Sequence, residues 1–406
     1  MTTPQIIKLA LAFAIIIGLI GCWFGFPKKR KQWLLAGVAI LIAVIVAEAL
    51  LRTFQPQYNG HNDLFEPDIA LGWRFVPGSK APISWSGEAS HYATINEDGF
   101  RDLPFSRQAS QEKTILCFGD SFVSNLTVKD SDVFTRHMEA LLPNTSVLNL
   151  GVNGYGQTQE FLLMREQFEL HDCDLAIVVL YLRNDFTDNI NTSWIYPRPV
   201  ISREATTTLE ILPPQQRARL KASPLDSLRR LHVVSLVNHT INDLVYRYEA
   251  GADGHRPSDL TPPEFYLCAR TPWEGTEQLV QSMKLLLLEM QLLAASNGIP
   301  ILYVIAPSMY QVDEPLWLAM IDDYGENAHA YQADLPNKLL MDFATEYKLA
   351  MIDLLPALSA ATKSGNKLYH PREQHWNAAG NEQVAKIISA YLTEKGWTTD
   401  EALSLE

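Results

Sequence analysis

The sequence predicts an α/β fold built around a five-stranded parallel sheet. From residue 114 onward, short apolar runs alternate with amphipathic helical stretches. Continuous apolar strands separated by such helices indicate a parallel sheet covered on both faces. Polar residues follow three of these strands, and ligands bind at the carboxyl ends of the strands in sheets of this kind. We therefore expect a three-layer α/β/α sandwich with a site at one edge of its sheet.

The predicted elements follow one another in a regular order. The strands are expected at 114–118, 146–150, 175–181, 299–305 and 349–354, and the helices at 131–142, 158–170, 275–296, 336–347 and 378–394. Residues 186–272 interrupt this alternation; they are rich in proline, with a leucine-rich helical stretch near 225–249. We expect them to form an insertion over the carboxyl edge within a domain that spans 114–398. Residues 53–113, rich in glycine, proline and aromatic residues, are predicted to be a juxtamembrane cover segment.

Residues 1–52 are predicted to form a transmembrane helical hairpin. Two long runs, 6–26 and 33–51, are apolar on every face, and about 20 such residues span the hydrocarbon core of a bilayer. Lys28 to Lys31 lie in the short connection, where positive charge indicates the cytoplasmic side. We expect a multi-pass protein of the inner membrane whose body is extracytoplasmic, in the periplasm or on the outer face. "LIGC" also reads like a lipoprotein cleavage box ending at Cys22, but little positive charge precedes it.

Charge and cysteine content exclude several kinds of partner. Residues 53–406 carry 27 basic and 45 acidic residues, a net charge of −18. A body this acidic repels a polyanion, so no nucleic-acid partner is expected. The four cysteines show no Cys/His spacing typical of zinc, and we expect neither a metal nor an organic cofactor. A disulfide between Cys173 and Cys268 is left open.

Four polar motifs occur at the positions where the fold predicts a site. The first strand runs into "GDS" (119–121), the second into "NLGVNGYG" (149–156) and the third into "YLRND" (181–185). "REQHWN" (372–377) comes just before the last helix. Acyl transfer needs a hydroxyl nucleophile, a base and donors for the developing oxyanion, and these segments contain all three. The G-x-S-x-G nucleophile elbow is missing, because Val123 stands where its second glycine would be.

The order of these motifs resembles that of the SGNH (GDSL-type) hydrolases, from about residue 93 to 395. The "INEDGFRD" lead-in and the anchor resemble a membrane-anchored bacterial branch of that family. The resemblance implies a flavodoxin-like SGNH fold, with Ser121 as nucleophile and His375 as base. It also implies an oxyanion hole made by the amides of Ser121 and Gly154 and the side chain of Asn184.

The sequence departs from the family pattern at two positions. Leu182 replaces a glycine two residues before the block asparagine, and the late acid is not at its usual place. Glu373 stands two residues before His375 and is expected to orient it. Failing that, a backbone carbonyl would hold the histidine in a Ser-His dyad. Trp376 is left open between stacking on a sugar ring and packing in the core.

Three functions are consistent with these residues. The first is a serine esterase that removes O-acyl groups, in particular acetyl groups, from carbohydrates or envelope glycans through an acyl-serine intermediate. The second is an O-acyltransferase that passes the acyl group to a polysaccharide with a membrane-bound O-acyltransferase partner. The third is a non-catalytic envelope assembly factor that uses the fold as a binding platform.

Overall fold

A computed structural model describes residues 29–54, 60–85, 89–108, 112–191, 196–202, 209–214, 231–249 and 263–396. The chain forms two compact units. One unit consists of Met1–Gly60, Pro82–Tyr92 and Leu220–Arg256, and the other of His61–Ala81, Ala93–Arg219 and Pro257–Glu406.

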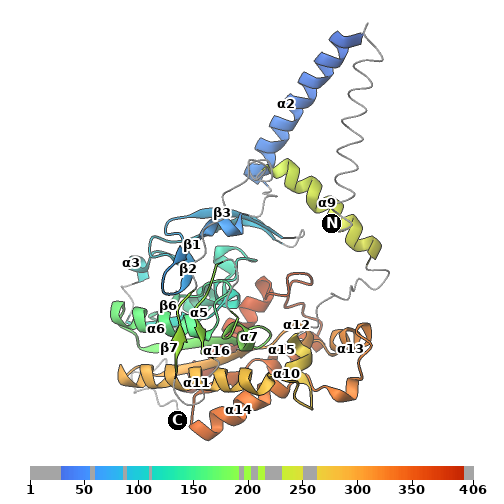
Figure 1. Ribbon diagram of the computed structural model, residues 1–406. Helices are drawn as coiled ribbons and strands as arrows, with labels where there is room; N and C mark the ends of the chain where they lie inside the picture. Colours follow the sequence, from blue (N-terminus) through green and yellow to red (C-terminus); the bar gives the residue numbers. More distant parts are fainter. Residues whose placement is uncertain are drawn as a thin grey trace. The chain divides into compact units, whose positions relative to one another are not determined.

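The larger unit is built on a five-stranded parallel sheet (Figure 1). Its strands are β5 (Lys113–Phe118), β6 (Thr145–Asn149), β7 (Leu175–Tyr181), β10 (Ile301–Ala306) and β11 (Met351–Asp353). They lie in the order β11-β10-β7-β5-β6, and each strand runs parallel to its neighbours. Read by position along the chain this is the 2-1-3-4-5 order of flavodoxin-like sheets, whose ligands bind where the order reverses, beside the first strand. The predicted fold class is confirmed, and each predicted strand overlaps the observed one.

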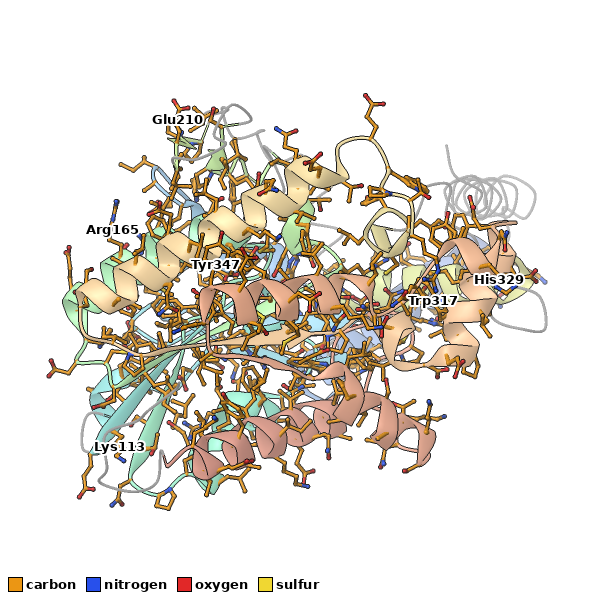
Figure 2. All side chains as sticks on the ribbon, turned by 90° about the horizontal axis from the view of Figure 1, so that it is seen from below. Lys113, Arg165, Glu210, Trp317, His329 and Tyr347 are labelled. Carbon is orange, nitrogen blue, oxygen red and sulfur yellow. The ribbon has the colours of Figure 1, made fainter. Side chains whose placement is uncertain are left out.

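Helices cover both faces of this sheet. The long helices are α5 (Phe134–Leu141), α6 (Gln157–Leu170), α11 (Thr276–Ser296), α14 (Leu335–Tyr347) and α16 (Ala378–Glu394). α5 packs against α16 on one face, and α6 packs against α11 on the other. Figure 2 shows the two covering layers, with Arg165 of α6 and Tyr347 of α14 among their surface side chains. All five predicted helices are present.

Shorter elements complete the larger unit. The helices are α3 (Phe105–Gln108), α4 (Ser121–Ser124), α7 (Asp185–Asp188), α10 (Pro263–Cys268), α12 (Met309–Val312), α13 (Glu314–Asp323) and α15 (Leu355–Lys363), with 3-10 turns η2 (His61–Leu64), η3 (Asp130–Asp132) and η4 (Ala328–Ala330). The antiparallel hairpins are β1 (Phe65–Asp68) with β2 (Gly72–Phe75), and β8 (Val200–Ile201) with β9 (Ile211–Leu212). β3 (Lys80–Trp85) pairs with β4 (Ala89–Thr94), and most of this hairpin, Pro82–Tyr92, belongs to the smaller unit.

The main core lies between the sheet and the layer that contains α5, α15 and α16. It includes Cys117 of β5 and Trp376 ahead of α16, both fully buried. The structure therefore places Trp376 in the core, and not on the surface where a sugar could stack on it. Cys117, Cys173 and Cys268 are all free thiols, so the disulfide left open by the sequence is not formed.

The smaller unit contains two long helices, α2 (Arg30–Phe54) and α9 (His232–Glu249). Within α2, the 24 residues Lys31–Phe54 are long and apolar enough to cross a membrane. This helix covers the second predicted span, 33–51, whereas the first, 6–26, lies outside the described residues. α11 passes the same test of length and composition, but it is partly buried as a core helix of the larger unit.

Candidate active site

The proposed nucleophile stands at a sharp turn between β5 and α4. Asp120 caps α4, because its Oδ1 accepts a hydrogen bond from the amide of Phe122 (2.8 Å). A Cβ on Gly119 would lie 2.3 Å from Cγ2 of Val123, so only glycine fits where the chain leaves the strand. Phe122 and Val123 are buried while Ser121 is half-buried. The turn thus leaves the hydroxyl of Ser121 accessible above a packed core.

Ser121 and His375 form a hydrogen-bonded pair. Oγ of Ser121 lies 2.8 Å from Nε2 of His375, and Nδ1 of His375 lies 2.9 Å from the main-chain oxygen of Glu373. A carbonyl oxygen can only accept, so Nδ1 must carry the proton. In the neutral ring Nε2 is then the acceptor, facing the serine hydroxyl. This is the tautomer that a general base needs.

The surroundings of His375 keep its ring neutral. The ring packs against Phe122, with the two centroids 5.0 Å apart. Burial lowers the pKa of His375 to about 4, and the hydrogen bond to Glu373 opposes this shift. At neutral pH the imidazole is therefore the free base.

A buried asparagine joins the serine turn to the histidine segment. Nδ2 of Asn125 donates to the main-chain oxygen of Trp376, the residue after His375 (2.9 Å). Asn125 is the C-cap of α4 and adopts a left-handed conformation, with φ of 32°. Nδ2 of Asn381 donates to the same oxygen of Trp376 (3.1 Å). The bond from Asn125 joins residues 251 positions apart in the chain, four residues after Ser121 and one residue after His375.

Arg101 holds the other side of the serine turn. Its buried guanidinium donates to the main-chain oxygens of Ser124 (2.8 Å), Asn125 and Val128 (2.6 Å). It also pairs with Asp130 (2.8 Å). Arg101 belongs to the "INEDGFRD" lead-in, so this segment stabilises the nucleophile turn through its main-chain oxygens.

The loop that carries Gly154 is fixed by the β1-β2 hairpin. Nε1 of Trp73 donates to the main-chain oxygen of Asn153 (3.1 Å), and Trp73 is fully buried. Oδ1 of Asn153 accepts from the hydroxyl of Ser124 (2.6 Å), which links this loop to the nucleophile turn. Gly154 itself has φ of 77°, a conformation that favours glycine. The loop therefore has a defined conformation next to the serine.

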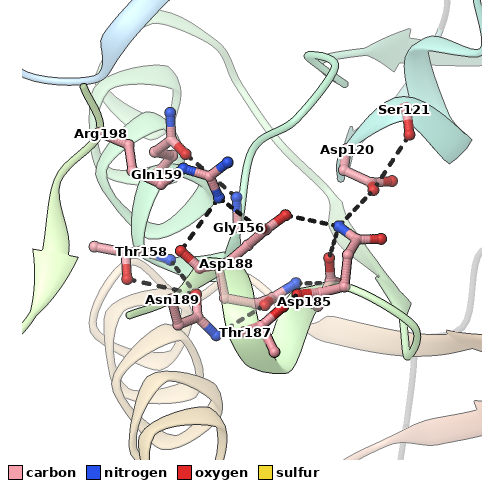
Figure 3. A network of polar contacts seen from close by, with 12 residues as sticks. Asp120, Ser121, Gly156, Thr158, Gln159, Asp185, Thr187, Asp188, Asn189 and Arg198 are labelled. Atoms are coloured by element: carbon pink, nitrogen blue, oxygen red, sulfur yellow. Dashed lines mark hydrogen bonds and ion pairs between the residues drawn. The ribbon is translucent and has the colours of Figure 1, made fainter. Parts of the chain in front are cut away.

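Asn184, the third predicted oxyanion donor, contacts three carboxylates, which are labelled in Figure 3 as Asp120, Asp185 and Asp188. Its Nδ2 donates to Asp188 (2.8 Å) and makes longer contacts with Asp185 (3.3 Å) and Asp120 (3.4 Å). Nη1 of Arg198, whose side chain is 2% exposed, pairs with Oδ1 of Asp188 (2.9 Å). The ion pair with Arg198 fixes the carboxylate of Asp188, and this carboxylate accepts the hydrogen bond from the side-chain amide of Asn184.

The other carboxylates of this network are buried and mutually repulsive. Burial raises the pKa values of Asp185 and Glu160 well above their usual range, and raises that of Asp120 to about 6. Oδ2 of Asp185 accepts from Nε2 of Gln157 (2.6 Å) and from the amide of Tyr181 (2.7 Å). Asp120 and Asp185 therefore hold the chain at the ends of β5 and β7 through main-chain amides.

The residues singled out from the sequence meet in part. Ser121 and His375 are in direct contact, and Asn184 lies within 3.4 Å of Asp120, the neighbour of Ser121. Glu373 contacts Nδ1 of His375 through its main-chain oxygen. Leu182, which replaces the family glycine, is buried.

Sequence reasoning missed the residues that position the site, namely Trp73, Arg101, Asn125, Asp188 and Arg198. Only Arg101 lay in a motif that we had noted, and its target could not be known without the fold. Among the described residues, no group of three or more His, Cys, Asp or Glu side chains could hold a metal ion.

Comparison with solved structures finds GDSL-type hydrolases and carbohydrate esterases, all at low identity. A similar solved structure is a member of the lipolytic protein G-D-S-L family from Veillonella parvula, at 14% identity and a TM-score of 0.35 over 69% of this chain and 98% of that one. A catalytic mutant of an acetylxylan esterase from Geobacillus stearothermophilus is 13% identical, with a TM-score of 0.35 over 73% of this chain and 98% of that one. A two-domain esterase active on acetylated mannans is 11% identical, with a TM-score of 0.36 over 74% and 54%. Such likeness is too low to assign an activity. No family model and no curated protein matches the chain.

Proposed function

We propose that the chain is a membrane-anchored, extracytoplasmic serine esterase that removes acetyl groups from carbohydrates or envelope glycans. The observation that carries the proposal is the contact of Ser121 Oγ with Nε2 of His375 at 2.8 Å, in a tautomer set by the main-chain oxygen of Glu373. This arrangement is a Ser-His dyad oriented by a backbone carbonyl.

The reaction proceeds in two steps through an acyl-serine. Oγ of Ser121 attacks the ester carbonyl carbon while Nε2 of His375 takes the hydroxyl proton, and the carbonyl oxygen becomes an oxyanion. The intermediate collapses when Nε2 returns the proton to the leaving alcohol. Water then attacks the acyl-serine by the same route in reverse, releasing the carboxylic acid and free Ser121.

The amides of Ser121 and Gly154 and the side chain of Asn184 are proposed to stabilise the oxyanion. Asp188 holds one N–H of Asn184 at 2.8 Å, while the contacts with Asp185 and Asp120 are long. The second N–H of the Asn184 amide makes only these long contacts, so it is available to donate to the oxyanion. Loss of one such donor costs about 10²–10³ in rate.

Charge supports a neutral substrate, and α2 supports the anchor. The net charge of −18 on residues 53–406 disfavours anionic esters, whereas acetylated sugars are neutral. The 24-residue apolar stretch of α2 has the length to cross a bilayer.

The test uses the full-length chain in detergent with p-nitrophenyl acetate and an O-acetylated glycan. We expect hydrolysis by the wild type, and labelling by a fluorophosphonate probe, which are both lost in Ser121→Ala. Equal activity in Ser121→Ala would refute the proposal, and a chain that neither hydrolyses nor labels would favour a binding platform. Adding a sugar acceptor distinguishes transfer, because an acyltransferase then releases acetylated sugar at the expense of acetate.

A further inference from the structure

The second helix of the smaller unit is fastened to the end of the candidate membrane span. Oε1 of Glu48 in α2 accepts a hydrogen bond from the amide of His232 (3.0 Å), and Oε2 accepts from the amide of Val233 (2.9 Å). These are the first amides of α9, which have no partner within the helix. Arg52 pairs with the same Glu48 (2.8 Å). Glu48 thus caps α9 and joins it to α2.

This attachment fixes the depth at which α9 begins. A helix of 24 residues is about 36 Å long, so the Lys31–Phe54 stretch fills a bilayer core with little to spare. Glu48 lies within two turns of the C-terminal end of that stretch, close to where lipid headgroups begin. Figure 1 shows α9 starting beside this end of α2. α9 therefore starts at the membrane surface if α2 spans.

The first ten residues of α9 are amphipathic. Apolar residues recur at helical spacing on one face, at Val233, Val234, Val237 and Ile241. Ser235 and Asn238 lie away from the centre of this face. Val237, in the middle of the apolar face, is 53% exposed. An apolar face with an exposed centre needs a covering surface.

The chain just before α9 carries the opposite charge to the rest of the body. Between residues 214 and 231 there are five basic residues and one acidic residue, Asp226, although residues 53–406 as a whole have a net charge of −18. Basic residues beside an amphipathic helix are attracted to anionic lipid headgroups. This charge pattern favours an anionic membrane surface over a protein partner as the surface that covers α9.

We propose that α9 lies in the headgroup layer of the bilayer, with its apolar face in the lipid, as an interfacial helix fastened to α2 by Glu48. The inference rests on the proposed membrane anchor and adds a second lipid contact to it. The apolar face of α9 is covered by the anionic leaflet on the side of the bilayer where α2 ends.

Fluorescence quenching in vesicles tests this placement. The full chain, with its native cysteines replaced by alanine, carries one environment-sensitive NBD label at Val237→Cys or, as a matched control, at Asn238→Cys. It is reconstituted in vesicles of 30% phosphatidylglycerol in phosphatidylcholine. We expect a blue-shifted emission from position 237 that is strongly quenched by spin-labelled lipid and weakly by aqueous iodide, with the opposite ranking at position 238. The Glu48→Ala variant should reduce lipid quenching at 237.

Three results would overturn the proposal. They are iodide quenching at 237, shielding of 237 from both quenchers, and equal lipid quenching at 237 and 238. Vesicle flotation separates the two levels of inference: if the chain floats with the vesicles, only the interfacial helix is wrong. If it does not float, the membrane anchor itself has failed.

Discussion

A backbone atom contacts the ring nitrogen of His375 that faces away from Ser121. Glu373 was predicted as the acid from its position, two residues before the histidine. The main-chain oxygen of Glu373 makes the contact with Nδ1 (2.9 Å). Because every residue has this oxygen, the identity of the side chain at 373 should matter little to the base.

We therefore expect Glu373→Ala to keep most of the activity. Its kcat/KM should stay within about threefold of wild type, against the loss of about 10⁴ that follows when an orienting carboxylate is removed from a triad. Ester hydrolysis by purified Glu373→Ala and Glu373→Gln checks this, with His375→Ala as the inactive control. A loss in Glu373→Ala approaching that of His375→Ala would instead show that the carboxylate acts in catalysis.

The pH dependence should reflect the lowered pKa of His375. The protonated ring cannot accept the serine proton, so activity falls as the pH drops through this pKa. Burial lowers it to about 4, so kcat/KM should be level near neutrality and half-maximal near pH 4. A profile of kcat/KM between pH 3.5 and 8 measures this, with near-UV circular dichroism at each pH to confirm folding. A midpoint near 6.5 would mean that the ring is solvated.

Much of the site could be predicted from residues, but its supports could not. "GDS" could be recognised because it follows the first predicted strand, and His375 because it comes just before the last predicted helix. The sequence left the partner of Nδ1 open between the Glu373 carboxylate and a backbone carbonyl, because the direction of a carbonyl depends on the local backbone, here with Gln374 at φ of 62°. Asn125 and Arg101 act through main-chain oxygens of distant segments, and a main-chain oxygen leaves no sequence signal.

At the scale of elements, the turn at α4 and the segment before α16 are held together by Asn125. Replacing Asn125 by alanine should shift His375 relative to Ser121 while Asn381 still satisfies the oxygen of Trp376. We expect kcat to fall by about 10²-fold, the cost of a misplacement near 1 Å, with a small change in KM. The stability cost should be near 1 kcal/mol.

Steady-state kinetics and urea unfolding of Asn125→Ala measure both quantities. Asn366→Ala is the matched control, since exposed Asn366 also donates to a main-chain oxygen, that of Ala361. Unchanged kcat in Asn125→Ala would show that the histidine segment keeps its place without this bond.

The β1-β2 hairpin should influence the oxyanion hole through Trp73. Trp73→Phe keeps an aromatic ring but removes the N–H that Asn153 accepts, so the loop with Gly154 loses its restraint. We expect a lower kcat, by up to the roughly 10²-fold worth of one oxyanion donor. Ester hydrolysis by Trp73→Phe, with exposed Trp273→Phe as control, checks this. Equal kcat in the two variants would exclude the link.

The elements themselves were predictable where burial dictates them. Four of the five strands are fully or largely apolar, and such runs flanked by helices have few alternative arrangements; β6 (TSVLN) is buried but mixed in composition. Short strands or turns were expected around "LGWRFVPG" in the cover segment, but the pairing of β1 with β2 was not predicted, because such short strands owe their pairing to the loop on which they pack. The helix near 225–249 was expected, and α9 is found at His232–Glu249.

For the molecule as a whole, the anchor and the body are expected on defined sides of the membrane. Alkaline phosphatase, which is active only outside the cytoplasm, should be active when fused after Glu406 and inactive when fused after Lys31. The basic residues of 28–31 keep that connection inside, and the hairpin returns the chain to the outside. The reverse pattern of activity would place the body in the cytoplasm. Blue-native electrophoresis of both fusions confirms that they are intact.

The contact between Ser121 and His375 also sets an order of events during synthesis. The proposed base, His375, follows the proposed nucleophile, Ser121, by 254 residues and comes after Gly154 and Asn184 as well. Synthesis from the N-terminus produces the hydroxyl first and the imidazole last. Under the proposed mechanism, a nascent or prematurely terminated chain that lacks the histidine would not hydrolyse esters, so only the finished molecule would be active.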